Sequence, residues 1–258
     1  MKFLNKDENG KFIVLTIPIE KNPSYGSGAS KGCFSIIKES LELEYYDEEF
    51  NNSPVEKGIQ TVNLETLEEV TSFVKNTNNF IIALGGDHSI GIGILNGLEN
   101  FSVLQLDAHP DLFYSWNGSE NNHRCFGRKA LSKANSLVQV GIRAMDKDEK
   151  ELIDSEDKIL SITTREFNKD SIKKILDKLS DNVYISIDVD VFDPSFIRKT
   201  GTPEPGGLHW QEVIDLLKEV FKSKNVVIAD INEFTGESRV EAYSLAKLAY
   251  KMMAMKNS

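Results

Sequence analysis

Two carboxylates and an imidazole follow one apolar run of this sequence at alternating positions. The run from Ser102 to Leu106 reads as a short buried strand, and Asp107, His109 and Asp111 come directly after it. One such aspartate would be structural, because aspartate and histidine commonly cap helices or bond turns at strand ends. Three together crowd like charges, whose burial without partners costs roughly several kcal/mol each. A divalent cation would neutralise them, so this stretch predicts a metal site as readily as a structural turn.

Polar side chains also follow three other apolar runs. His88 comes after residues 80–84, Asp188 and Asp190 close the run that begins at residue 182, and Glu233 follows the run 225–231. Each has an ordinary explanation when taken singly. The histidine could be a satisfied core residue, the aspartates could cap a turn, and the glutamate could be solvated.

Taken together, the residues at these four strand ends would share one crevice, because ligands gather at the carboxyl ends of parallel strands. The crevice would hold four aspartates, two histidines and a glutamate, with no basic residue nearby in the sequence to pair with them. The four aspartates carry a charge of −4, which two divalent cations cancel. Oxygen ligands with two imidazoles and no thiolate favour Mn²⁺ over zinc.

Alternating apolar runs and amphipathic stretches must position these residues. The runs lack polar alternation, as expected of strands buried on both faces. They cover residues 12–19, 80–84, 102–106, 137–142, 159–163, 182–188 and 225–231. Helical patterns cover residues 63–75, 170–179, 210–221 and 240–253. This order predicts a single α/β domain over residues 1–258, with three α/β/α layers and a mostly parallel central sheet of about eight strands.

The composition limits the partners of this chain. Its 258 residues are 40% hydrophobic and 27% charged, with a net charge of −10, which argues against nucleic-acid binding. No apolar run approaches the ~20 residues needed to cross a membrane, and the start lacks the apolar stretch of a signal peptide. Cys33 and Cys125 are too few for a disulfide framework. We therefore expect a cytoplasmic protein that binds neither nucleic acid nor membrane.

The motifs in this order resemble those of the arginase and agmatinase family, the ureohydrolases. "GGDHS" (85–89), "DAHPD" (107–111) and "SIDVDVFDP" (186–194) look like its three metal-binding motifs. "GTPEPGGL" (201–208) and "DINEF" (230–234) stand where two further family blocks are expected. The resemblance extends from about Phe12 to Lys251 and implies an arginase-like fold.

The resemblance also implies a site with two Mn²⁺ ions and hydrolysis of a guanidinium group to release urea. One ion would be held by His88, Asp107, Asp111 and Asp188, and the other by Asp107, His109, Asp188 and Asp190. Asp111 would help to steady the attacked carbon, His123 would carry a proton to the leaving amine, and Glu233 would pair with the substrate guanidinium. Asp230 would line the site or support its ligands.

The resemblance is greatest to agmatinases, which implies a small cationic guanidino substrate, agmatine, and putrescine as the second product in polyamine biosynthesis. Ser24, Tyr25, Gly26 and Gly28 match positions marked in agmatinases. Arginine, aminopropylagmatine, guanidinobutyrate and formiminoglutamate remain alternative substrates. The family also implies a homo-oligomer, a trimer or a hexamer. A catalytically silent metal-binding relative and a more distant single-zinc deacetylase are the alternative kinds of protein.

The chain departs from the family pattern near the expected mouth of the site. "IRKTGTP" stands where the family usually has Pro-Gly or Pro-Ala before "TGTP", so Arg198 and Lys199 are expected near the mouth. Either could meet a substrate carboxylate. His209 is expected at the start of a helix, without a role in the site.

Overall fold

The computed structural model describes residues 1–258 except Glu8, Asn22, Ser24 and Glu237. Within this part of the chain, eight strands form one sheet in the order β2-β1-β3-β8-β7-β4-β5-β6, and every neighbouring pair is parallel. The strands are β1 Phe12–Ile17, β2 Ile59–Asn63, β3 Phe80–Gly85, β4 Ser102–Leu106, β5 Leu137–Ile142, β6 Ile159–Thr163, β7 Asn182–Asp188 and β8 Asn225–Asn232.

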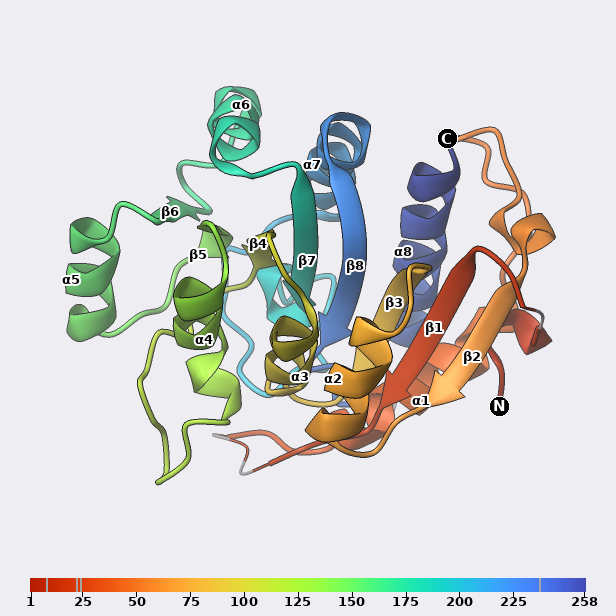
Figure 1. The fold of residues 1–258 in the computed structure, drawn as a ribbon, viewed down its shortest axis with the longest axis horizontal. Helices are drawn as coiled ribbons and strands as arrows, with labels where there is room; N and C mark the ends of the chain where they lie inside the picture. The colour runs from red at the N-terminus through yellow and green to blue at the C-terminus, as the bar shows by residue number, and fades with distance from the viewer. Residues whose placement is uncertain (8, 22, 24, 237) are drawn as a thin grey trace.

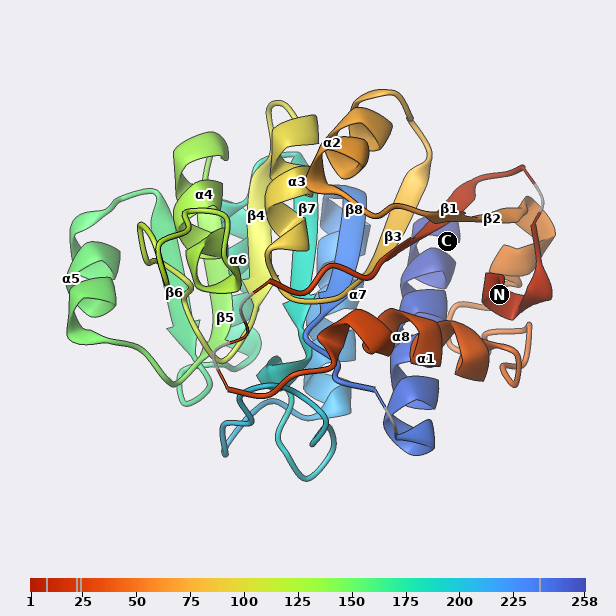
Figure 2. The ribbon, with the colours of Figure 1, turned by 90° about the horizontal axis from the view of Figure 1, so that it is seen from below.

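Helices cover both faces of this sheet (Figures 1 and 2). The helices are α1 Ala29–Ser40, α2 Leu67–Lys75, α3 Ile90–Gly97, α4 Phe126–Lys133, α5 Lys147–Ser155, α6 Lys169–Lys178, α7 Trp210–Ser223 and α8 Arg239–Asn257. Short 3₁₀ turns are η1 Phe3–Asn5, η2 Pro54–Lys57, η3 His123–Cys125 and η4 Val189–Val191. Figure 2 shows α2, α3 and α4 on one side of the sheet and α1, α7 and α8 on the other. The predicted three-layer α/β/α fold is confirmed.

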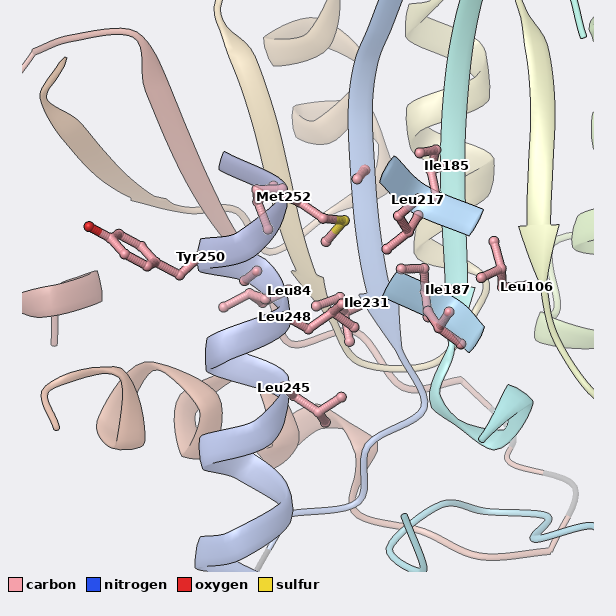
Figure 3. Close-up of a cluster of buried hydrophobic side chains, with 14 of the residues drawn as sticks. Leu84, Leu106, Ile185, Ile187, Leu217, Ile231, Leu245, Leu248, Tyr250 and Met252 are labelled. Atoms are coloured by element: carbon pink, nitrogen blue, oxygen red, sulfur yellow. The ribbon is translucent and has the colours of Figure 1, made fainter. Parts of the chain in front are cut away.

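Two hydrophobic clusters hold the layers together, one on each face of the sheet. Side chains of α7 and α8 pack on alternate residues of the central strands, such as Ile185 and Ile187 (Figure 3). On the other face, Leu67, Val70 and Val74 of α2 pack with side chains of α3 and α4. Their spacing gives α2 one apolar stripe, and a Thr66–Glu69 capping box begins the helix.

Seven of the eight strands match the apolar runs, and the match is residue for residue at β4, β5, β6 and β7. The sequence pattern missed β2, whose residues are partly exposed and include polar side chains. It lies at the edge of the sheet next to β1. An edge strand does not need apolar residues on both faces, so it leaves a weaker signal than a central one.

Candidate metal and active site

The four strands that carry polar residues at their ends are the four central neighbours β3-β8-β7-β4. Because the strands are parallel, their carboxyl ends meet at one edge of the sheet. His88 follows β3, Glu233 follows β8, and Asp188 ends β7 with Asp190 in the turn behind it. Asp107, His109 and Asp111 follow β4. The strand order therefore brings together side chains that lie up to 145 residues apart in the chain.

The first cluster of this edge surrounds the His88 imidazole. Its Nδ1 lies 3.1 Å from Asp111 Oδ2, 3.3 Å from Asp107 Oδ2 and 3.7 Å from Asp188 Oδ2. All four side chains are buried. Nδ1 itself is buried and forms no hydrogen bond of acceptable geometry with the described residues. A nitrogen lone pair facing three carboxylate oxygens is a suitable ligand set for a cation.

The second cluster shares Asp107 with the first. His109 Nδ1 lies 2.9 Å from Asp190 Oδ2 and 3.7 Å from Asp107 Oδ1. The geometry thus gives two groups of possible metal ligands, one of His88, Asp107 and Asp188 and the other of Asp107, His109 and Asp190. Asp107 belongs to both, as predicted for a bridging ligand. Asp188 belongs to the first group, and its sharing with the second stays a prediction.

Residues behind His88 fix which of its nitrogens faces the carboxylates. Its Nε2 lies 2.8 Å from Ser186 Oγ, and that hydroxyl donates to Asp230 Oδ1 at 2.8 Å. Since the hydroxyl has one proton and gives it to Asp230, Ser186 must accept from Nε2–H. Although burial lowers the pKa of His88, the carboxylates of Asp107 and Asp111 raise it well above its ordinary value. Nδ1, which faces them, then holds a proton that a metal ion would displace. The ring also stacks on Phe126, with centroids 4.1 Å apart.

Ser186 was missed by the sequence reasoning, although a signal was present. It stands two residues before Asp188 on β7, and side chains two apart on a strand share a face. Asp230 is fully buried and accepts hydrogen bonds from Ser186, Tyr184, Asn232 and the Ile187 amide. Asp230 holds Ser186, which in turn bonds His88, and it does not line the pocket described below. Of its two predicted roles, support of a ligand and lining of the site, the geometry favours support.

Burial and repulsion from neighbouring acids shift Asp111 and Asp188 toward their protonated forms, whereas the two histidines lower the pKa of Asp107 despite its burial. Burial and the neighbouring Asp107 charge raise the pKa of Asp111 to about 7. Burial, with the charges of Asp190 and Asp107, raises the pKa of Asp188 well above its ordinary value. Although burial lowers the pKa of His109, the charge of Asp190 outweighs it and brings the value to about 11. Without a cation, this edge therefore retains protons that metal binding would displace.

Glu233 and His123 line a pocket at this edge of the sheet together with three of the predicted ligands. A pocket of about 160 Å³ is lined by Pro23, Tyr25, Gly26, His109, Asp111, His123, Arg124, Asp188, Gly201, Thr202 and Glu233. Glu233 Oε1 accepts the backbone N–H of His88 at 2.8 Å. Glu233 and Asp111 both have left-handed backbones, with φ of 64° and 52°. Such conformations are strained in residues other than glycine and are frequent at functional sites.

His123 lies in the turn η3 and lines the pocket, outside both ligand groups. Burial lowers its pKa to about 4, and the positive charges of His88 and Arg124 add to this effect. The ring is therefore neutral at neutral pH. A neutral imidazole can accept a proton and pass it on, as predicted for this residue.

The cation at the pocket wall is not one of those expected from the sequence. Arg198 Nε lies 3.7 Å from Glu241 Oε1, and the Arg198 side chain is 77% exposed. Neither Arg198 nor Lys199 is among the residues that line the pocket, and their predicted place near its mouth stays a prediction. Arg124 lines it instead, with its guanidinium 4.3 Å from the ring centre of Phe113 and 4.1 Å from that of Trp116.

Two other positions complete the placement of the predicted residues. Tyr25 and Gly26 line the pocket, as their match to agmatinase positions suggested, whereas Ser24 lies outside the described residues. His209 precedes α7 as its N-cap, in agreement with its predicted place. No helix in the described part of the chain combines the length and apolar character needed to span a membrane.

Comparisons with known proteins agree with this geometry. The sequence model of the Arginase family matches residues 10–255. An N(1)-aminopropylagmatine ureohydrolase of Synechocystis sp. is 34% identical, over 93% of this chain and 87% of that protein. An agmatinase of Pyrococcus horikoshii is 33% identical, over 96% of this chain and 93% of that protein. The structure of an agmatine ureohydrolase of Thermoplasma volcanium superimposes with a TM-score of 0.89 at 28% identity, over 100% of this chain and 94% of that chain.

Proposed function

Because the chain belongs to the arginase family of ureohydrolases, we propose that it hydrolyses the guanidinium group of agmatine and releases urea and putrescine. One observation carries the proposal. The Glu233 carboxylate lines the same small pocket as His109, Asp111 and His123, at the edge where two ligand groups meet. A guanidinium needs an anionic partner, and among the acids that line this pocket, Asp111, Asp188 and Glu233, only Glu233 is not a proposed metal ligand.

The residues of this edge suit two Mn²⁺ ions. One would be held by His88, Asp107, Asp111 and Asp188, and the other by Asp107, His109, Asp188 and Asp190. The fit rests on His88 Nδ1, which faces three carboxylates while Ser186 holds Nε2, and on four aspartates without a lysine or arginine ion pair in the described chain. Bound divalent cations supply positive charge that lowers the pKa of a water molecule toward neutrality.

The chain itself would contribute three actions to the reaction. Glu233 would orient the substrate by accepting hydrogen bonds from its guanidinium nitrogens. Asp111 faces the same pocket and would accept a hydrogen bond as the planar guanidinium carbon becomes tetrahedral. His123, neutral before the reaction, would take up a proton and deliver it to the departing amine nitrogen.

Urea release from a panel of guanidino compounds, with Mn²⁺ present, tests this proposal. Agmatine should be hydrolysed with a kcat/KM about 30- to 4,000-fold above that of arginine. Arginine adds an α-carboxylate, which would enter an acidic pocket that neither Arg198 nor Lys199 lines. Equal or better turnover of arginine would show that Arg124 receives this carboxylate, and would exclude agmatine as the preferred substrate.

N(1)-aminopropylagmatine is the second candidate substrate, because relatives with this name reach 34% identity in two organisms. It belongs in the same panel, since it carries the same guanidinium head on a longer amine.

A protein that binds Mn²⁺ but releases no urea from any compound would be a catalytically silent relative. One zinc per chain, with activity indifferent to Mn²⁺, would contradict the proposed metal centre. The homo-oligomer, the cytoplasmic location and a place in polyamine biosynthesis stay predictions.

A further inference from the structure

Gly201 is a glycine that the fold itself does not require. All 17 glycines lie in the described part of the chain, and 16 of them have a structural reason. Six have left-handed φ values: Gly28, Gly58, Gly118, Gly141, Gly206 and Gly236. At ten others an added Cβ would come within 3.0 Å of another atom: Gly10, Gly26, Gly32, Gly85, Gly86, Gly91, Gly93, Gly97, Gly127 and Gly207.

Gly201 falls in neither class. Its φ is not left-handed, and the atoms nearest to an added Cβ are Glu233 Oε2 and the Gly26 N and O, all at 3.9 Å. This distance is ordinary van der Waals contact, so the described residues around Gly201 would accept alanine here without moving. Its neighbour across the pocket differs, because a Cβ on Gly26 would come 2.8 Å from the Gly201 Cα. The reason for glycine at 201 must therefore lie outside the folded chain.

The open space at Gly201 adjoins the acid that would receive the substrate. Both residues line the pocket, and an added Cβ at Gly201 would lie 3.9 Å from Glu233 Oε2, the carboxylate oxygen that does not accept from the His88 backbone. A guanidinium nitrogen bonded to this oxygen would lie at about 2.9 Å, and it cannot approach a methyl carbon closer than about 3.4 Å. The added methyl would lie 3.9 Å from the same oxygen. It would therefore block every nitrogen position that lies within roughly 60° of the line from Glu233 Oε2 to the methyl carbon.

We propose that Gly201 determines specificity by leaving room for a guanidinium nitrogen at Glu233. The inference rests on the proposed function, since it assigns the head group of the substrate to this space. Gly201 thus sets the width of the head group that the pocket admits, while Glu233 supplies the charge that attracts it. It also gives a role to the "GTPEPGG" segment, which contributes neither metal ligands nor a proton carrier.

The test is Gly201→Ala in the Mn²⁺-loaded protein. Its melting temperature and Mn²⁺ content should equal those of the wild type, because among the described residues beyond its chain neighbours no atom would come closer than 3.9 Å to the added methyl. Its kcat/KM for agmatine should fall about 10- to 200-fold, the range for one methyl group in a binding pocket. Gly201→Val should reduce it further. Pro203→Ala is the matched control, because Pro203 is exposed on the same loop and does not line the pocket.

A binding measurement separates this inference from the proposed function. Calorimetric titration of the metal-free protein with agmatine should give a Kd at least about 10-fold weaker for Gly201→Ala than for the wild type. If the wild type releases no urea from agmatine, the proposed function fails, and this titration still decides the role of Gly201. Wild-type kinetics and affinity in a folded Gly201→Ala protein would overturn the inference. Loss of stability or Mn²⁺ in that variant would also overturn it, because the glycine would then be structural.

Discussion

The chain buries acidic side chains in two regions and balances their charge in different ways. Against α8, Asp47 is fully buried, and Lys251 Nζ lies 3.2 Å from its Oδ2 and 2.9 Å from Glu49 Oε2. Lys247 Nζ lies 3.6 Å from Asp47 Oδ2. At the carboxyl edge of the sheet, the four buried aspartates have ion-pair contacts with histidines alone among the described residues. We call these regions the lysine-paired cluster and the histidine-paired cluster.

The pKa values of the two clusters differ accordingly. In the lysine-paired cluster, hydrogen bonds and charge from Lys218 and Lys251 outweigh burial and lower the pKa of Glu49. In the histidine-paired cluster, burial and neighbouring acids raise the pKa of Asp188 and of Glu233 well above their ordinary values. A lysine supplies a permanent charge at neutral pH, whereas histidine must be neutral to bind a metal. The second cluster therefore leaves its negative charge for cations from outside.

The largest effect should come from Asp188→Asn in the histidine-paired cluster. Turnover of agmatine should fall by about three orders of magnitude or more, together with Mn²⁺ content, because the neutral amide is a poor ligand. The metal-free variant should melt no lower than the metal-free wild type, since the change removes repulsion within the cluster. Urea release, metal analysis and calorimetry measure the three effects. Full activity in this variant would show that the aspartates do not form the metal site.

His123→Ala tests whether His123 transfers protons while the other histidines of this region bind metal. The variant should retain its Mn²⁺, because His123 lies outside both ligand groups. Turnover should fall by about 10²- to 10⁴-fold, the usual contribution of a positioned acid–base group. Metal analysis beside steady-state kinetics separates the two properties. A loss of metal would mean that His123 is a ligand and that its role as a proton carrier is misassigned.

Lys251→Met should break the lysine-paired cluster and leave the site intact. Its ammonium is nearly buried, and its removal leaves Asp47 with the more distant Lys247. The free energy of unfolding should fall by about 3 kcal/mol, as when one partner of a buried ion pair is lost. Urea denaturation measures this change, and kcat/KM per folded molecule should equal that of the wild type. Added Mn²⁺ should stabilise the variant and the wild type equally, so the difference between them should persist. A difference that Mn²⁺ abolishes would contradict the comparison.

The smallest effect should be the pH dependence of the metal-free protein. The pKa of Asp111 rises to about 7 and that of Asp230 to about 6 on folding, each chiefly through burial. The folded chain then holds more protons than the unfolded one between about pH 4 and 7, so its stability falls as the pH rises through this window. The melting temperature should drop by a few degrees from pH 5 to pH 7.5.

Two controls sharpen this pH experiment. The lysine-paired cluster should contribute nothing to the slope, because the pKa of Glu49 is lowered and that of Lys251 is raised. The ion pairs of the lysine-paired cluster stabilise the fold fully at any pH above the ordinary pKa of glutamate and below that of lysine. Their contribution is therefore constant across the window. With Mn²⁺ added the slope should reverse, since metal binding requires deprotonated ligands. A flat profile without metal would show that burial does not raise the pKa of Asp111 and Asp230 on folding.

The sequence by itself determined the local parts of this molecule. Continuous Val, Ile and Leu runs indicate β4 and β7 without any neighbour, because both faces of such a strand must be buried. The residue types after these runs likewise indicate a cation site, since the aspartates outnumber any nearby basic group. Both conclusions follow from short segments, within which chain chemistry and backbone periodicity leave little choice.

The tertiary structure alone decided which distant groups meet and in which direction long side chains point. The order β3-β8-β7-β4 puts Glu233 beside the His88 backbone, and nothing local to either segment specifies that neighbour. Arg198 turns toward Glu241 while Arg124 reaches the pocket wall, because the packing of rings and helices around a flexible side chain selects its direction. That the described residues around Gly201 leave room for a methyl group likewise emerges only from the positions of their atoms.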